Sequence, residues 1–276
     1  FDFRGIKMGV PICEDIWTNN VCNKLKKQGC EIIISPNGSP FDKYKINQRK
    51  KVIEDRISEV RLPFVYVNQV GGQDELVFDG SSLVMNADKE IIYRSPQWEE
   101  DRAIIEFDQK EKKFLSQNFV NNDLTDLENI YMATVTGLRD YVLKNRFPGV
   151  ILGLSGGIDS AFCAAVAVDA LGEDKVEGFM LPSIYTSQNS FDDAEECAKR
   201  LNISLEKISI EKTYLSLEES LEKVKKNKEI PLDWNETLQQ LSNLCFNQPT
   251  TNFLIFIRNY AFKFSIFGFF EKMWII

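Results

Sequence analysis

The chain has 276 residues, of which 43% are hydrophobic and 27% charged, and this composition excludes a disordered or collagen-like protein. At roughly 100 to 200 residues per domain, the length predicts two domains. The net charge of -8 argues against a dedicated nucleic-acid surface, because such a surface needs clustered Lys and Arg.

The histidine and cysteine content narrows the possible catalytic mechanisms further. There is no histidine, which excludes Ser-His-Asp and Cys-His mechanisms and most zinc chemistry. The six cysteines form no CxxC pair, so neither a zinc ribbon nor a disulfide scaffold is predicted, and a reducing cytosol is the expected compartment. Any nucleophile must therefore be activated by Glu, Asp or Lys.

The start of the chain indicates a fragment of a longer protein. The first residue is Phe1 rather than Met, and it leads directly into a strand that is expected to be buried. No charged leader followed by an apolar run precedes that strand, so no signal peptide is predicted.

The first part of the chain alternates short apolar runs with amphipathic segments. Residues 6–12 and 31–35 predict strands, with a helix between them that ends at Gln28. A second helix is predicted at 42–60, before Pro63 and the strand 64–68. Together with short strands at 80–85, 90–93 and 102–107, these segments predict an α+β, sandwich-like layout.

A polar segment without apolar period predicts a linker, with a domain boundary near residues 110–122. A helix is predicted from Leu124 to Tyr141, and strands and helices alternate after it. The strands are expected at 150–154, 175–181 and 204–210, and the helices at 161–171, 191–201 and 212–225. This βαβα order predicts a parallel, doubly wound sheet.

The last residues have a different character. From Asn252 to Ile276 the sequence is rich in phenylalanine and has no turn chemistry, while Arg, Lys and Glu interrupt the apolar run, which disfavours a membrane-spanning helix. Unpatterned sequence of this kind is typical of a shifted reading frame, and residues 237–276 are interpreted as an atypical tail. As real protein, the tail would have to cover some surface or aggregate.

The strongest motif is Ser155-Gly156-Gly157-Ile158-Asp159-Ser160, between the strand 150–154 and the following helix, where open α/β sheets bind ligands. The glycines let a polyanion approach the backbone, and helix N-terminal amides and the two serine hydroxyls offer donors. A carboxylate beside phosphate requires a divalent cation, so Asp159 predicts Mg²⁺. The alternative is an ordinary glycine-rich turn with an Asp favoured by the helix dipole.

This motif resembles the PP-loop of ATP pyrophosphatases, which cleave ATP between the α and β phosphates and leave AMP on a substrate oxygen. A Walker loop would instead carry Lys before its final Ser or Thr. The resemblance implies an ATP-binding set consisting of Gly153, Leu154, Ser155, Gly156, Gly157, Ile158, Asp159 and Ser160, with Asp159 also at the metal.

A cysteine just past the first strand is a second candidate, because a tight turn can present a nucleophile there. Taken alone, Cys13 would more often be a small buried hydrophobe. The runs PICEDIW and ISPNGSPF, the following Lys45, and the segment 67–80 resemble the amidase domain of the nitrilase superfamily. That superfamily uses a Glu-Lys-Cys triad. In that superfamily the Glu and Lys lie upstream of the cysteine, at positions before Phe1, so no residue of this chain is assigned to either role.

A nitrilase-like part followed by a PP-loop part resembles the glutamine-dependent NAD synthetase family. The resemblance implies that residues 1–115 are the C-terminal part of a nitrilase-like α/β sandwich. Residues 123–236 would be the truncated, doubly wound PP-loop domain, which is similar to adenine nucleotide alpha hydrolases. The tail 237–276 departs from the family, which has there an Arg-bearing helix and a later strand and loop.

The resemblance also implies the roles of individual residues. Cys13 would attack the glutamine amide and form a thioester, with Glu14, Ser39 and Lys45 holding glutamine. Ammonia would pass to the second site, where ATP adenylates deamido-NAD. Met180 and Thr186 belong to a segment, 180–187, that would lie near the adenosine and the adenylated substrate, and whose alternative is an ordinary turn.

Three functional hypotheses follow. The first is a cytoplasmic NAD-forming ligase that uses ATP, Mg²⁺, glutamine and deamido-NAD, has no nucleic-acid or membrane partner, and forms a homo-oligomer at full length. The second is another PP-loop amidotransferase, making asparagine or a guanine nucleotide, although those enzymes use unrelated glutaminase domains. The third is an inactive truncated remnant, and this chain alone is expected to be inactive.

Overall fold

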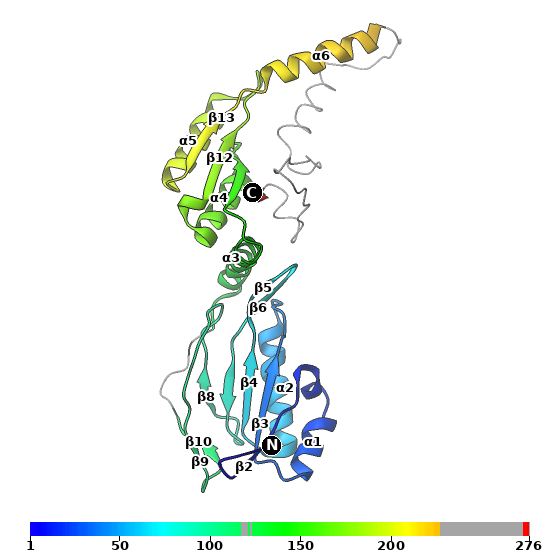
Figure 1. Cartoon of the computed structure of the whole chain (residues 1–276), viewed down its shortest axis with the longest axis vertical. Coiled ribbons are helices and arrows are strands. Elements are labelled where there is room, and N and C mark those ends of the chain that lie inside the picture. The colour runs from blue at the N-terminus through cyan, green and yellow to red at the C-terminus, as the bar shows by residue number, and fades with distance from the viewer. Residues whose placement is uncertain (117–120, 122, 227–272, 276) are drawn as a thin grey trace. The chain divides into compact units, whose positions relative to one another are not determined.

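The computed structural model describes residues 1–116, 121, 123–226 and 273–275 (Figure 1). The chain divides into two compact units, Phe1–Asp140 and Tyr141–Ile276. Each unit is built around its own sheet.

The sheet of the first unit has six strands in the order β1-β2-β3-β4-β7-β8. The three central strands β2, β3 and β4 are parallel, and the remaining pairs are antiparallel. The carboxyl ends of the parallel strands therefore meet at one edge. The strands are β1 Asp2–Phe3, β2 Ile6–Gly9, β3 Ile32–Asn37, β4 Phe64–Asn68, β7 Leu83–Met85 and β8 Ile91–Arg94.

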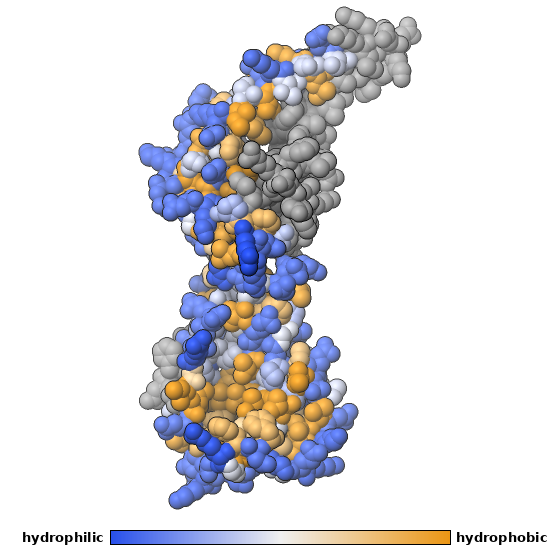
Figure 2. Space-filling view, viewed as in Figure 1, coloured by the Kyte–Doolittle hydropathy of each residue, from blue (hydrophilic) through white to orange (hydrophobic). Residues whose placement is uncertain are grey.

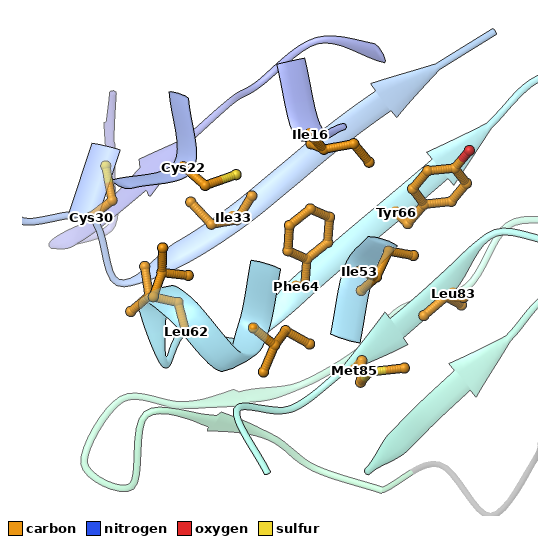
Figure 3. Packing of buried hydrophobic residues seen from close by; sticks show 12 residues of the cluster. Ile16, Cys22, Cys30, Ile33, Ile53, Leu62, Phe64, Tyr66, Leu83 and Met85 are labelled. Carbon is orange, nitrogen blue, oxygen red and sulfur yellow. The ribbon is translucent and has the colours of Figure 1, made fainter. Parts of the chain in front are cut away.

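Helices cover one face of this sheet: the short 3-10 helix η1 (Cys13–Ile16), α1 (Asn20–Lys27) and α2 (Lys45–Val60). Their apolar side chains form a core with the sheet, in which Ile33, Ile53 and Phe64 are fully buried (Figure 3). The predicted helix 42–60 is confirmed except for its first turn. That turn is not helical because the carboxylate of Asp42 accepts the N–H of Tyr44 and closes a turn before α2.

A second, smaller cluster lies on the sheet and includes Ile32, Ile92 and Phe114. Met8, Ile34 and Val65 are half-buried against it, and Figure 2 shows hydrophobic residues gathered on the visible side of this unit. The hairpin of β9 (Phe107–Asp108) and β10 (Lys113–Phe114) supplies Phe114.

Some strand predictions in this unit are too long, and a hairpin is missing from them. Of the predicted strand 102–107, only Phe107 lies in a strand, the two-residue β9. The chain turns directly after it, because the Asp108 carboxylate accepts two backbone N–H groups in a tight turn. The predicted strand 80–85 begins at Leu83, since Gly80 and Ser81 both have positive φ. The hairpin of β5 (Val70–Gln73) and β6 (Leu76–Asp79) was not predicted, because two glycines interrupt its pattern.

Helix α3 (Asp126–Lys144) confirms the predicted helix and shows why the packing boundary is later than the linker. The side-chain nitrogens of Gln97 and Trp98 donate to Asn129 at 2.8 Å and 2.9 Å. Asp140 accepts the N–H of Gly72 at 2.7 Å. Because α3 up to Asp140 packs on the first unit, the compact unit extends beyond the predicted boundary near 110–122, and the domain limits 1–115 and 123–236 stay a prediction.

The sheet of the second unit has the order β13-β12-β11-β14. Strands β11, β12 and β13 are parallel, which confirms the predicted parallel sheet, and β14 is antiparallel to β11. The buried helix α4 ends at Gly172 with φ +85°, as its glycine predicts. The elements are β11 Val150–Gly153, α4 Ile158–Leu171, η2 Glu173–Lys175, β12 Val176–Met180, α5 Gln188–Arg200, β13 Ser204–Lys207, α6 Glu211–Lys226 and β14 Met273–Ile275.

The tail 237–276, interpreted from the sequence as atypical, lies almost entirely outside the described residues. Only β14 of the tail is described. In the part of the chain that the structure describes, no helix has the length and hydropathy of a membrane span.

Candidate active sites

The loop between β11 and α4 is closed by its own serine hydroxyls. The hydroxyl of Ser160 donates to the Gly157 carbonyl at 2.9 Å and accepts the N–H of Ser155 at 3.3 Å. The Ser155 hydroxyl in turn accepts the N–H of Gly157 at 3.3 Å. Ser160 is buried, so its hydroxyl shapes the loop rather than reaching outward.

Gly156 lets this loop contact the start of α5 by backbone alone. Its φ is +79°, and a Cβ at this position would lie 2.6 Å from the carbonyl oxygen of Ser190. Ser190 belongs to the first turn of α5, and its N–H donates to the hydroxyl of the N-cap residue Ser187. A side chain at position 156 would therefore push the loop away from α5.

The outer edge of the loop suits an anion. Ser155, Gly157 and Ile158 are exposed, and the first amides of a helix lack intrahelical partners and form its positive end. A Cβ added at Gly153 would have no other atom within 4 Å, so the approach to the loop along β11 is open. The structure thus brings the predicted residues 153–160 to one strand end, with exposed Asp159 in the first helical turn.

A cation at this edge would depend on ligands from outside the protein. Within the described ranges, no group of three or more His, Cys, Asp or Glu side chains is arranged to hold a metal ion. Mg²⁺ takes one or two carboxylates and completes its shell with water and substrate phosphates, so a single carboxylate such as that of Asp159 fits a phosphate-bound Mg²⁺.

Met180 and Thr186 lie at the two ends of the loop after β12. The Met180 side chain is 3% exposed and belongs to the interior. The Thr186 hydroxyl accepts the N–H of Ser183 at 2.9 Å, and the Thr186 N–H donates to the Ser183 carbonyl at 3.1 Å. Both predicted residues therefore hold this loop in shape.

The cysteine site lies at the carboxyl edge of the first unit's sheet. Cys13 follows β2 and Ser39 follows β3, which are neighbouring parallel strands. Cys13 is half-buried and has φ +48°, in the left-handed region that non-glycine residues adopt uncommonly. Beside it, the exposed Glu14 belongs to the same 3-10 turn.

Lys45 is brought to the cysteine turn by a cation-π contact. Its Nζ lies 4.9 Å from the ring centroid of Trp17, which ends the 3-10 helix that starts at Cys13. Because Lys45 is the first residue of α2, this contact joins the start of α2 to the cysteine turn.

Ser39 is held in a buried polar network. Its hydroxyl accepts from Nε of Arg49 at 3.0 Å, its carbonyl accepts from Nη2 of Arg49 at 2.8 Å, and its N–H donates to Asn68 at 2.9 Å. Nη1 of Arg49 donates to both carboxylate oxygens of Asp79, at 2.8 Å and 2.9 Å. Sequence reasoning predicted Ser39 but missed the residues that hold it.

Burial sets the electrostatics of this network. Arg49 is 3% exposed and Asp79 is fully buried. Burial raises the pKa of Asp79, and the Arg49 guanidinium opposes that shift. Burial also raises the pKa of Tyr66, against the effects of Arg49 and the Ser39 hydroxyl, and Cys13 adds to the rise. The signal for the pair was present in the sequence: Asp79 ends an apolar strand, and Arg49 lies one turn after Lys45 on the inner side of α2.

Differences in thiol burial predict a selective alkylation. Cys22 is fully buried and burial raises its pKa to about 11, so roughly one thiol in a thousand is ionised at pH 8. Iodoacetamide at pH 8 is expected to modify Cys13 at least about tenfold faster than Cys22, as read by peptide mass spectrometry. In urea both should react alike. Faster modification of Cys22 in the folded protein would contradict the packing of α1.

The two halves of the chain match two families. Residues 1–113 match the carbon-nitrogen hydrolase family, and residues 130–239 match the NAD synthase family. Cys13, Glu14, Ser39 and Lys45 lie in the first match, and the loop 153–160 lies in the second.

Whole-chain comparisons find both parts together in single proteins. The glutamine-dependent NAD(+) synthetase of Rhodobacter capsulatus is 43% identical over 220 residues, which cover 78% of this chain and 39% of the relative. That of Acinetobacter baylyi is 42% identical over 204 residues, with 74% and 38% covered. The chain thus spans about two fifths of the length of these relatives.

Solved structures agree. A glutamine-dependent NAD+ synthetase from Acinetobacter baumannii, in complex with ADP, superposes with a TM-score of 0.78 at 39% identity. The match covers 88% of this chain and 48% of that one. The corresponding enzyme from Cytophaga hutchinsonii has a TM-score of 0.67 at 19% identity, which shows the fold alone.

Proposed function

We propose, on the premise that this chain belongs to the glutamine-dependent NAD(+) synthetase family, that the whole protein amidates deamido-NAD to NAD with ATP and glutamine. The observation that carries the proposal is the order of the two family matches, with a left-handed cysteine turn in the first and a glycine loop in the second. A glutaminase site that releases ammonia is thereby joined to a site that activates a carboxylate.

At the first site Cys13 is the proposed nucleophile. Its thiol attacks the amide carbon of glutamine while its proton passes to the amide nitrogen, ammonia leaves, and water hydrolyses the resulting thioester to glutamate and the free thiol. Glu14, Ser39 and Lys45 are proposed to hold glutamine. Two observations support their placement: Ser39 follows the neighbouring parallel strand, and Lys45 contacts the ring that ends the cysteine turn.

At the second site the loop 153–160 is the proposed cradle for the phosphates of ATP. The carboxylate of deamido-NAD attacks the α phosphorus, pyrophosphate leaves, and ammonia then displaces AMP from the acyl carbon. The ADP complex of the Acinetobacter baumannii relative and the exposed residues at the start of α4 support a nucleotide here. Mg²⁺ beside Asp159 would neutralise the charge of the leaving pyrophosphate. Met180 and Thr186 are proposed to hold the loop that faces the adenosine.

The test assays the complete protein for AMP and NAD, with ATP, deamido-NAD and either glutamine or ammonium chloride. Cys13→Ala is expected to abolish glutamine-driven synthesis and to leave ammonia-driven synthesis within about twofold of wild type, because only the first site loses its nucleophile.

Cys197→Ala, at a half-buried cysteine on α5 outside both proposed sites, is the matched control and should retain both activities. Aspartate in place of deamido-NAD tests the asparagine-forming alternative and should give no AMP. Loss of ammonia-driven synthesis in a folded Cys13→Ala variant would show that the two-site assignment is wrong.

A further inference from the structure

Two tyrosines join the loop after β12 to the first turn of α6. The hydroxyls of Tyr185 and Tyr214 lie 3.1 Å apart, and their rings pack edge to face with centroids 5.5 Å apart. Tyr214 is 2% exposed, whereas Tyr185 is 45% exposed. The pair therefore connects a buried anchor to an exposed loop.

Backbone hydrogen bonds fix the first residues of the same loop. The N–H of Ile208 donates to the Met180 carbonyl at 2.8 Å, and the N–H of Ile210 donates to the Pro182 carbonyl at 3.1 Å. These bonds continue the pairing of β12 and β13 beyond the ends of both strands. Tyr185 lies in the middle of the loop, and its contact with Tyr214 connects this part of the loop to α6.

The hydroxyl contact gives a buried polar group its partner. A buried hydroxyl requires a partner, and the partner of the Tyr214 hydroxyl is Tyr185. Burial, and then the hydrogen bond with Tyr185, raise the pKa of Tyr214, so this hydroxyl stays protonated at neutral pH.

The loop leads directly into the part of α5 that contacts the phosphate loop. Ser187 ends the loop and caps α5, and the carbonyl oxygen of Ser190, three residues later, lies 2.6 Å from the position that a Cβ on Gly156 would take. A displacement of the loop would therefore move the turn of α5 that packs on Gly156.

We propose that Tyr214 is a positioning residue of the nucleotide site. It holds Tyr185 and the loop 181–187, and through them it keeps the first turn of α5 against Gly156 in the geometry that accepts the phosphates of an adenine nucleotide. Tyr214 acts through this chain of contacts and not by touching the nucleotide. The inference rests on the proposed function, because it requires that the loop 153–160 binds ATP.

The test measures the dissociation constant of ADP by calorimetry, and KM for ATP and kcat, in the complete protein. Tyr214→Phe keeps the ring and removes the hydroxyl bond, and it is expected to raise the ADP dissociation constant and KM about fivefold with kcat within twofold of wild type. Tyr185→Phe removes the same bond from the exposed side and should match it. Tyr214→Leu, which also loses the ring contact, should bind more weakly than either.

Tyr93→Phe is the control, because the Tyr93 hydroxyl also donates a hydrogen bond, to Asp101 in the first unit. Loss of that hydrogen bond should leave ADP binding unchanged. Unchanged ADP binding in Tyr214→Phe and Tyr185→Phe, with Tyr214→Leu only lowering the melting temperature, would mean that the pair is structural and would overturn the inference. Wild-type protein that forms no AMP from ATP and deamido-NAD would instead refute the proposed function.

Discussion

Arg49→Met is expected to lower the free energy of unfolding by about 3–5 kcal/mol, because it leaves the buried carboxylate of Asp79 without its counter-charge. The same change removes two donors from Ser39, one to its hydroxyl and one to its carbonyl. The measurement is urea unfolding followed by circular dichroism. Glutamine use should fall with it, since the turn that carries Ser39 loses its support.

Lys51→Met on the same helix is the matched control. Lys51 pairs with Asp55 at 3.2 Å, and both side chains are largely exposed, so the expected loss is about 0–1 kcal/mol. The double variant Arg49→Met, Asp79→Leu removes both charges and should recover much of the stability that Arg49→Met loses. Equal losses for Arg49→Met and Lys51→Met would contradict the assignment of a buried ion pair.

Gly156→Ala is expected to weaken ADP binding by about tenfold or more. The added Cβ would lie 2.6 Å from the Ser190 carbonyl oxygen, closer than real contacts allow, at a φ of +79° that alanine disfavours. The loop can relieve this contact only by moving away from α5. Calorimetric titration of the complete protein with ADP measures the effect.

Two other glycines separate steric contact from backbone strain. Gly172 also has positive φ but meets no atom within 4 Å, so Gly172→Ala should cost stability, about 1 kcal/mol, and leave ADP binding unchanged. Gly153→Ala adds a methyl group in open space beside the same loop and tests whether any substitution here is harmful. Gly156→Ala with normal ADP affinity would place the nucleotide elsewhere.

The second unit could be predicted largely from the sequence because most local signals agreed with the fold. Strand β11 is a short apolar run, and Gly172 ends α4 where its freedom at positive φ is needed. Strand β13 reads Ser-Leu-Glu-Lys, so its place in the alternating order indicated it rather than its composition. The loop 155–160 was placed correctly at a strand end. What the pattern could not give was the use of the serine hydroxyls, because the Ser160 hydroxyl donates inward to the Gly157 carbonyl of its own loop.

The first unit shows the limit of local patterns. The network around Ser39 includes bonds between residues 29 and 30 positions apart, and only the register of β3, β4 and the β5–β6 hairpin brings them together. The same hairpin was missed because Gly71 and Gly72 break its alternation. Gly72 is required there by the close approach of α3, which a sequence read without the tertiary contact does not reveal.

The attachment of α3 to the first unit sets where hybrid enzymes can be joined. A recombination point in the linker near residue 116 would take Asn129 from one parent and Gln97 and Trp98 from the other, so the three-way hydrogen bond would depend on both parents having compatible residues. A junction after Asp140 keeps that bond, and the bond of Gly72 to Asp140, within one parent. When parts are exchanged among relatives, the junction should therefore be chosen from the packing of α3 and not from the composition of the linker.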